Sequence, residues 1–300
     1  MKNIFSLLST LLFLQSSLFS QRTVEVSYAQ DGKGNYVFSC INKAFCNYVL
    51  SIEFTTLENA QSDHSLPYEA EVRPGLNKLF TLSQVKGTDG IQLKYKSSYR
   101  KGCLHPSFSP DFTYLLPIAP GKEAQAYEIW NTANNSAGNG QVDSSYTIRL
   151  KMKPGDTIYA ARRGVVSAID VSNTENDAGT TTTGSWNFVE IVHGDCSFGQ
   201  YGVLKKDGAF VRPGQVVETG TPIGLVGGDR YGRGSDVRFS VSYNGGPFSA
   251  PTPLQFWTKK NGKGRLKHGG IYISEHPQAI IALEMSKKAP VKKGKGKGKG

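Results

Sequence analysis

Short runs in which apolar and polar residues alternate dominate residues 21–130. Clear examples are Thr23–Tyr28, Leu50–Phe54 and Ile91–Tyr95. A period of two is typical of half-buried strands, because successive side chains of a strand point to opposite faces. Turn-forming clusters such as Asp31–Gly34 and Arg73–Gly75 separate the runs. The pattern predicts an N-terminal β-sandwich of about seven strands over residues 21–130.

A second β-rich segment covers residues 146–254. Its strand candidates are Thr157–Ala160, Gly164–Ile169, Asn187–Val192 and Val237–Tyr243. Residues 131–145 are rich in Asn, Gly and Ser, which is typical of a linker between domains. Residues 255–286 are then a C-terminal extension. We therefore expect a mainly β chain of two antiparallel β domains.

The N-terminus has the three parts of a secretory signal peptide. Lys2 gives a basic start, Ile4–Phe19 is apolar and rich in serine, and the small Ser20 follows. The apolar part is too short to span a bilayer comfortably, and no later run is long enough. We expect residues 1–20 to be removed near Ser20–Gln21. The protein is then exported to the periplasm or beyond, with no transmembrane segment.

The net charge of +11 is placed unevenly along the chain. Seven lysines lie in residues 287–300, and together with Lys2 they account for eight of the eleven positive charges. The folded body is therefore close to neutral, which argues against a specific nucleic-acid partner. An alternating Lys/Gly tail buries no apolar surface and is predicted to be disordered. Anionic envelope polymers are its expected partners; a solubilising tail without a partner is the alternative.

Four cysteines allow three complete disulfide pairings. They are Cys40, Cys46, Cys103 and Cys196. Export permits disulfides. Cys40 and Cys46 are close in sequence, between two strand-like runs, so we predict a Cys40–Cys46 disulfide. Cys103 and Cys196 fall in different predicted domains and are expected to be unpaired.

Several phrases of the second segment resemble the lysostaphin-like, or LytM-type, zinc metalloendopeptidases, which have a duplicated hybrid motif fold. Gly155–Val166 resembles the first hairpin of that family, and Asn187–Asp195 its central strand and turn. Tyr201–Leu204 stands where the family has Tyr-x-His-Leu, and Val211–Gly227 follows the family pattern closely. The order and spacing of the phrases carry the resemblance. It implies the fold of residues 146–254 and a relation to enzymes that cut peptidoglycan peptides.

The resemblance also implies where zinc and the catalytic groups would lie. Such a family binds zinc through His and Asp of H-x-x-x-D and the second His of H-x-H, and other histidines of the motifs assist catalysis. Counting back from Gly155, the expected positions in this chain hold different residues: Tyr146, Leu150, Val203, Asp236 and Arg238. Leucine and valine do not ligate metals, and arginine stays positively charged. We therefore expect no zinc, no other cofactor and no catalytic residue.

Three functions are compatible with these residues. The first is a catalytically inactive homologue that binds peptidoglycan or an envelope protein, as regulator or scaffold. Its candidate groove residues are Tyr146, Tyr201, Asp236 and Arg238. We expect Arg238 to occupy part of the former metal position beside Asp236, with Tyr146 and Leu150 filling the remaining volume. The second is an active peptidoglycan metalloendopeptidase with a relocated metal site. The third is a purely structural β module.

Overall fold

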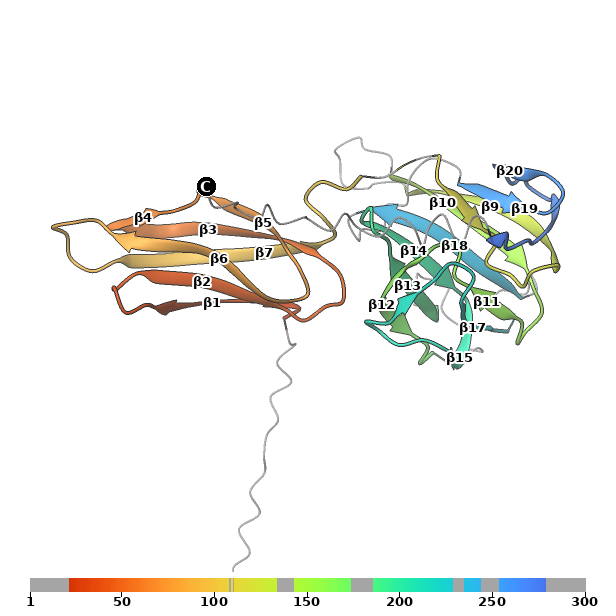
Figure 1. The fold of residues 1–300 in the computed structure, drawn as a ribbon, viewed down its shortest axis with the longest axis horizontal. Coiled ribbons are helices and arrows are strands. Elements are labelled where there is room, and N and C mark those ends of the chain that lie inside the picture. The colour runs from red at the N-terminus through yellow and green to blue at the C-terminus, as the bar shows by residue number, and fades with distance from the viewer. Residues whose placement is uncertain are drawn as a thin grey trace, which may run out of the picture.

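The computed structural model describes residues 22–107, 109, 111–133, 143–173, 186–228, 235–243 and 254–278. The elements within these ranges are β-strands (Figure 1). The mainly β fold class is therefore confirmed. No helix in the described ranges has the length and apolar character needed to cross a membrane. The signal peptide predicted over residues 1–20 and the Lys/Gly tail of residues 287–300 lie outside the described residues and stay predictions.

The N-terminal domain is a sandwich of two sheets. One sheet has the order β1 (Val24–Gln30), β2 (Tyr36–Asn42), β6 (Gly75–Gln84), β4 (Ala60–Ser62). The other has the order β5 (Tyr68–Val72), β3 (Tyr48–Glu58), β7 (Gln92–Lys101). Phe38 and Phe80 stack between the sheets with their ring centroids 4.6 Å apart. The seven strands confirm the predicted sandwich, but its boundary differs.

An eight-stranded sheet organises the second domain. Its order is β16 (Val216–Val217), β12 (Gly164–Asp170), β13 (Phe188–Val192), β14 (Ser197–Gly202), β18 (Asp236–Tyr243), β10 (Asp143–Lys151), β9 (Glu123–Ala133), β21 (Ile271–Ile273). Two three-stranded sheets complete it: β11 (Thr157–Tyr159), β17 (Pro222–Val226), β15 (Leu204–Ala209); and β20 (Gly262–Arg265), β19 (Gln255–Thr258), β8 (Thr113–Leu115).

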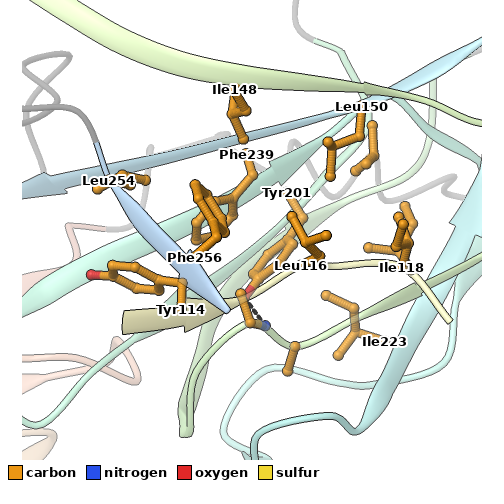
Figure 2. Close-up of a cluster of buried hydrophobic side chains, with 14 of the residues drawn as sticks. Tyr114, Leu116, Ile118, Ile148, Leu150, Tyr201, Ile223, Phe239, Leu254 and Phe256 are labelled. Atoms are coloured by element: carbon orange, nitrogen blue, oxygen red, sulfur yellow. Dashed lines mark hydrogen bonds between the residues drawn. The ribbon is translucent and has the colours of Figure 1, made fainter. Parts of the chain in front are cut away.

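One face of the large sheet is covered by the hydrophobic core of the second domain. Ile148 and Leu150 of β10 point into this core together with Phe239 of β18 and Tyr201 of β14 (Figure 2). The rings of Tyr201 and Phe239 lie 4.9 Å apart, and the hydroxyl of Tyr201 accepts a hydrogen bond of 2.7 Å from the backbone N–H of Ala161. Because strand residues alternate, the residues between these core positions face the other side of the sheet.

The predicted domain boundaries need correction. β9 pairs with β10 along most of its length, so β9 belongs to the second domain and the sandwich ends with β7. Residues 131–145 are therefore not a linker between domains, since both ends of that segment belong to paired strands of one sheet; residues 134–142 lie outside the described ranges. The predicted extension also joins this domain, because β21 pairs with β9 and β19 pairs with β8. The composition of residues 131–145 does not distinguish a linker between domains from a segment that joins two paired strands.

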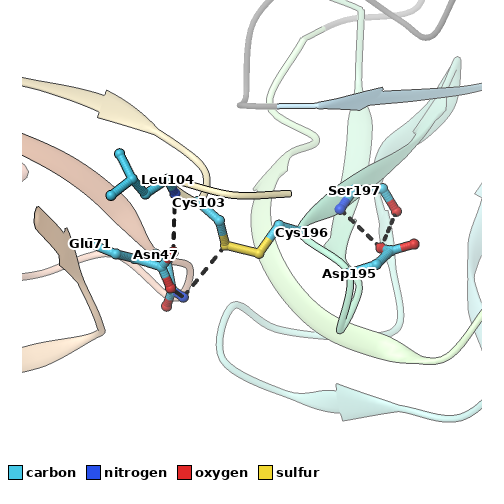
Figure 3. Close-up of a disulfide and its surroundings, with 7 residues drawn as sticks. All are labelled: Asn47, Glu71, Cys103, Leu104, Asp195, Cys196 and Ser197. Carbon is cyan, nitrogen blue, oxygen red and sulfur yellow. Dashed lines mark hydrogen bonds between the residues drawn. A yellow bond between two sulfur atoms is a disulfide. The ribbon is translucent and has the colours of Figure 1, made fainter. Parts of the chain in front are cut away.

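The predicted Cys40–Cys46 disulfide is wrong. Cys40 and Cys46 are buried free thiols, while Cys103 and Cys196 form a disulfide (Figure 3). Cys40 points from β2 into the sandwich core, whereas Cys46 lies beyond the end of β2, near Lys101 and Glu190. Burial raises the pKa of each thiol to about 11, which keeps both thiols protonated. Closeness in sequence did not indicate closeness of side chains.

The Cys103–Cys196 disulfide ties the segment that follows β7 to the second domain. Lys101 at the end of β7 forms a buried ion pair with Glu190 of β13, close to the disulfide. Ser107 donates a backbone hydrogen bond of 3.2 Å to the carbonyl of Asp195. Three independent contacts therefore hold the segment between the two domains against the second domain.

Candidate functional site

The face of the large sheet opposite the core carries a cluster of charged residues on β10 and β18. These strands are antiparallel neighbours, with Arg149 opposite Arg238 and Lys151 opposite Asp236. Leu150 of β10 and Val237 of β18 are fully buried in the core. The residues that flank them on each strand therefore project to the other face. Alternation along two adjacent strands thus brings charges distant in sequence to one place.

Asp236 lies between two arginines. Its Oδ2 is 3.5 Å from Nε of Arg149, and its Oδ1 is 3.4 Å from Nε of Arg238. The exposed fractions are 6% for the Asp236 side chain, 13% for Arg149 and 15% for Arg238. The three charges are therefore largely removed from water, which makes their mutual pairing matter far more than that of a surface ion pair.

Two aromatic rings flank the arginines. The guanidinium of Arg149 lies over the ring of Tyr127, 4.5 Å from its centroid, and that of Arg238 lies 5.0 Å from the ring centroid of Trp186. Gly202 stands opposite Arg238 on β14, and a Cβ added there would come within 3.1 Å of the indole nitrogen of Trp186. The glycine therefore leaves the room that the indole occupies. Cation–π contacts of this kind hold each guanidinium plane in a fixed position.

The predicted site residues divide into two groups. Asp236 and Arg238 lie side by side and pair, as predicted. Val203 is buried in the turn between β14 and β15, with a positive φ of 69°. Tyr146, Leu150 and Tyr201 lie in the core and do not line the face that carries Asp236 and Arg238. The expectation that Tyr146 and Leu150 fill the former metal position is therefore wrong.

Arg149 is the residue that the sequence prediction missed. Counting back from Gly155 gave the last position of the H-x-x-x-D motif to Leu150, whereas Arg149 is the residue of β10 that lies opposite Arg238. The signal was available in the strand itself. Tyr146, Ile148 and Leu150 form an alternating apolar set that must face the core. Arg149 then has to face the other side, with Asp236 and Arg238.

A separate pocket of about 580 Å³ lies at the junction of the two domains, around the Cys103–Cys196 disulfide. Arg162 in its wall donates a 2.8 Å hydrogen bond to Asp195 and stacks on Phe112 at 3.8 Å. His193 also lines it, and Nδ1 of His193 lies 2.8 Å from the carbonyl oxygen of Arg163. This pocket is distinct from the charged cluster, and sequence patterns gave no indication of it because it forms where two domains meet.

The sequence model of Peptidase family M23 matches residues 143–250. The segment that matches this family is called the M23 domain below. The match begins at the first residue of β10 and includes β18, so the charged cluster lies on strands of that domain. The resemblance seen in the motifs is thereby confirmed at the level of the family.

Solved structures similar to the chain come from several organisms. Helicobacter pylori Csd3 is 14% identical with a TM-score of 0.32, and the match covers 89% of this chain and 80% of that one. A zinc-containing peptidase from Vibrio cholerae is 14% identical with a TM-score of 0.33, covering 77% and 86%. A putative peptidase M23 from Pseudomonas aeruginosa is 13% identical with a TM-score of 0.27, covering 73% and 87%. No curated protein matches the chain.

The residues at the charged cluster of the M23 domain do not fit a zinc ion. Zinc needs about four donors from His, Cys, Asp, Glu or water, and Asp236 is flanked instead by two permanently positive side chains. Within the described ranges no three His, Cys, Asp or Glu residues come together in a way that would hold a metal. His268 packs on Tyr127 and His276 on Tyr159, while His193 is buried near the disulfide. These histidines lie apart from one another.

Removal of the Asp236 charge should destabilise the M23 domain strongly. We expect Asp236→Asn to lower the free energy of unfolding by about 3 kcal/mol, because two largely buried guanidiniums then lose the carboxylate they share. Denaturant unfolding measures this. The matched control is Glu25→Gln, which breaks an exposed pair with Lys43 and should cost under about 1 kcal/mol. Equal costs for the two variants would contradict the buried charge cluster.

His193 should make the protein less stable in mild acid. Burial, together with repulsion by the Arg162 guanidinium, lowers the pKa of His193 to about 3. The pKa of a histidine in the unfolded chain is near 6.5. At pH values between 6.5 and the folded-state pKa, the unfolded chain therefore binds a proton that the folded protein excludes. Above about pH 6.5 His193 therefore does not lower the free energy of unfolding. As the pH falls below that value the free energy of unfolding decreases, by about 2 kcal/mol at pH 5.

The test compares denaturant unfolding at pH 7 and pH 5. The loss between these two values should be about 2 kcal/mol smaller in His193→Gln than in the wild type. His105→Gln serves as the control, because His105 is exposed. An unchanged pH dependence in His193→Gln would show that His193 is not buried in its neutral form.

Proposed function

We propose that the chain is a catalytically inactive homologue of the M23 peptidases in the bacterial envelope. It binds peptidoglycan or a partner protein there, as a regulator or scaffold. The observation that carries the proposal is the pairing of Asp236 with both Arg149 and Arg238. Asp236 and Arg238 stand at the two positions of the H-x-H motif, the second of which is a metal ligand in the family that the sequence resembles.

The chemistry of these side chains opposes metal-assisted hydrolysis. Two guanidiniums within 3.5 Å of the carboxylate already neutralise it and repel a divalent cation. Val203, where the motif has a histidine, offers neither a proton nor a hydrogen bond to a substrate. Without zinc to acidify a water molecule, the domain has no evident nucleophile for a peptide bond.

The same face retains features of a binding surface. It combines positive charge with the rings of Tyr127 and Trp186, and Lys151 adds an exposed ammonium next to them. Peptidoglycan peptides carry carboxylates, so charge complementarity favours them as ligands. The signal peptide and the lysine tail predicted from the sequence agree with a place in the envelope, where anionic polymers are abundant.

A relocated metal site draws no support from the described residues, because their histidines lie far apart in the fold and each packs in a different environment. A purely structural role differs from the proposal in one testable respect, since it requires no ligand on the charged face.

The proposal is tested by incubating the purified protein with peptidoglycan, in the presence of zinc and, separately, of a chelator. We expect no release of peptides in either condition, and retention of the protein in the pellet. Retention should persist when residues 287–300 are removed, because the M23 domain rather than the lysine tail provides the binding surface. An active M23 enzyme serves as the positive control for hydrolysis.

Two outcomes would overturn the proposal. Release of peptides that stops on chelation would show an active metallopeptidase. Loss of all peptidoglycan binding when residues 287–300 are removed, with no protein partner bound by the remaining domains, would instead indicate a purely structural role.

A further inference from the structure

We propose that the hairpin of β19 and β20 is a docking surface for a lipid bilayer that carries anionic phosphate headgroups. The hairpin follows the segment that matches the M23 family, and it lies at the end of the second domain remote from the sandwich (Figure 1). This inference goes beyond the proposed function, because it concerns a different surface and a different partner from the charged cluster around Asp236.

The first argument is the concentration of positive charge on the hairpin. Five basic residues lie within nine positions, and all five are exposed: Lys259, Lys260, Lys263, Arg265 and Lys267. Glu275 is the one acidic residue of the described range 254–278. None of the five cations forms an ion pair with a described carboxylate, whereas Lys43 and Lys122 elsewhere on the surface each do. The hairpin is therefore a concentrated positive surface, which attracts anionic groups.

The second argument is the direction in which these cations point. Lys263 and Arg265 are two residues apart on β20, so both side chains lie on the same face. Gly264 between them is opposite Phe256, which is fully buried in the core, so the face with the two cations is the outward one. The turn between the strands adds two further lysines, and β20 is the edge strand of its sheet. Cations spread along an edge strand and its turn match the many anionic groups of a lipid surface.

Exposed apolar side chains beside the cations favour a bilayer over a water-soluble anionic polymer. The backbone N–H of Lys259 donates a 3.0 Å hydrogen bond to the carbonyl oxygen of Ile273, which joins the hairpin turn to β21. Ile271 is two residues earlier on the same face of β21 and is 60% exposed. Trp257 of β19 also faces outward, and its Nε1 donates a 2.9 Å hydrogen bond to Glu275. A membrane interface accepts Trp and aliphatic side chains beside Lys and Arg, whereas a soluble polymer offers them no apolar phase.

The chain that follows the hairpin contains a second basic segment. Residues 287–300 hold seven lysines. Each basic residue close to an anionic membrane surface strengthens binding about fivefold, and stable attachment takes more than one weak signal. The hairpin and the lysine tail provide two such signals in one chain.

The test measures binding of the purified protein to sedimented vesicles at low ionic strength. Vesicles of phosphatidylcholine are compared with vesicles that also contain phosphatidylglycerol. We expect at least about tenfold tighter binding to the anionic vesicles, because only their headgroups attract the hairpin cations. The affinity should fall as salt is added, since salt screens the charge of the headgroups.

Paired variants assign this binding to the hairpin. The double variant Lys260→Gln with Lys263→Gln should weaken it about thirtyfold, at about fivefold for each lysine. The matched control, Lys94→Gln with Lys96→Gln, removes the same charge from exposed positions of β7 and should leave the affinity within about twofold. Ile271→Ser should weaken binding to the vesicles about fivefold, and should leave binding of soluble polyphosphate unchanged. The lysine tail is the same in every variant, so it does not contribute to these differences.

Equal losses in the hairpin variant and the β7 variant would show attraction by net charge alone and would overturn the docking surface. Equal affinity for the two kinds of vesicle would overturn it as well. Unchanged vesicle binding in Ile271→Ser, or tighter binding of soluble polyphosphate than of anionic vesicles, would overturn the assignment to a lipid surface.

Discussion

The carboxylate of Asp236, shared by Arg149 and Arg238, is the interaction on which the functional account depends. Each arginine approaches a different oxygen of the same carboxylate, at 3.5 and 3.4 Å, from a neighbouring strand and from the same strand respectively. Removal of these groups from water is costly, and their pairing offsets that cost only while all three stay together. The cluster thus links the pairing of β10 with β18 to the chemistry of the face they form.

The fold positions this cluster through its other face. Ile148, Leu150 and Phe239 anchor β10 and β18 in a core that also contains Tyr201. Because these side chains fix which way each strand faces, a shift by one residue would send the arginines into the core. The disulfide and the Lys101–Glu190 pair act elsewhere, at the junction with the sandwich, and hold the two domains together there.

Alternation and Gly-bounded turns predicted the β class, the seven-strand sandwich and the family of the second domain, because these features are local in sequence. The pairing of Asp236 with Arg238 was also predictable, since two residues apart on a strand share a face. The spacing from Gly155 did not identify Arg149, because a count from a distant turn does not show which residues of β10 share a face. The alternation of apolar residues along β10 does show it. The disulfide, the place of β9 and the pocket between domains depend on long-range contacts. Neither the composition of residues 131–145 nor the spacing of Cys40 and Cys46 contains that information.

The central proposal is that Arg149 and Arg238 occupy the place where an M23 peptidase would hold its metal. Crystals of the protein grown with zinc and measured at the zinc absorption edge test it most directly. The account predicts no anomalous peak at Asp236, with the guanidiniums of Arg149 and Arg238 on either side of its carboxylate. A zinc peak bound to Asp236 and further side-chain ligands, with the arginines turned away, would contradict it.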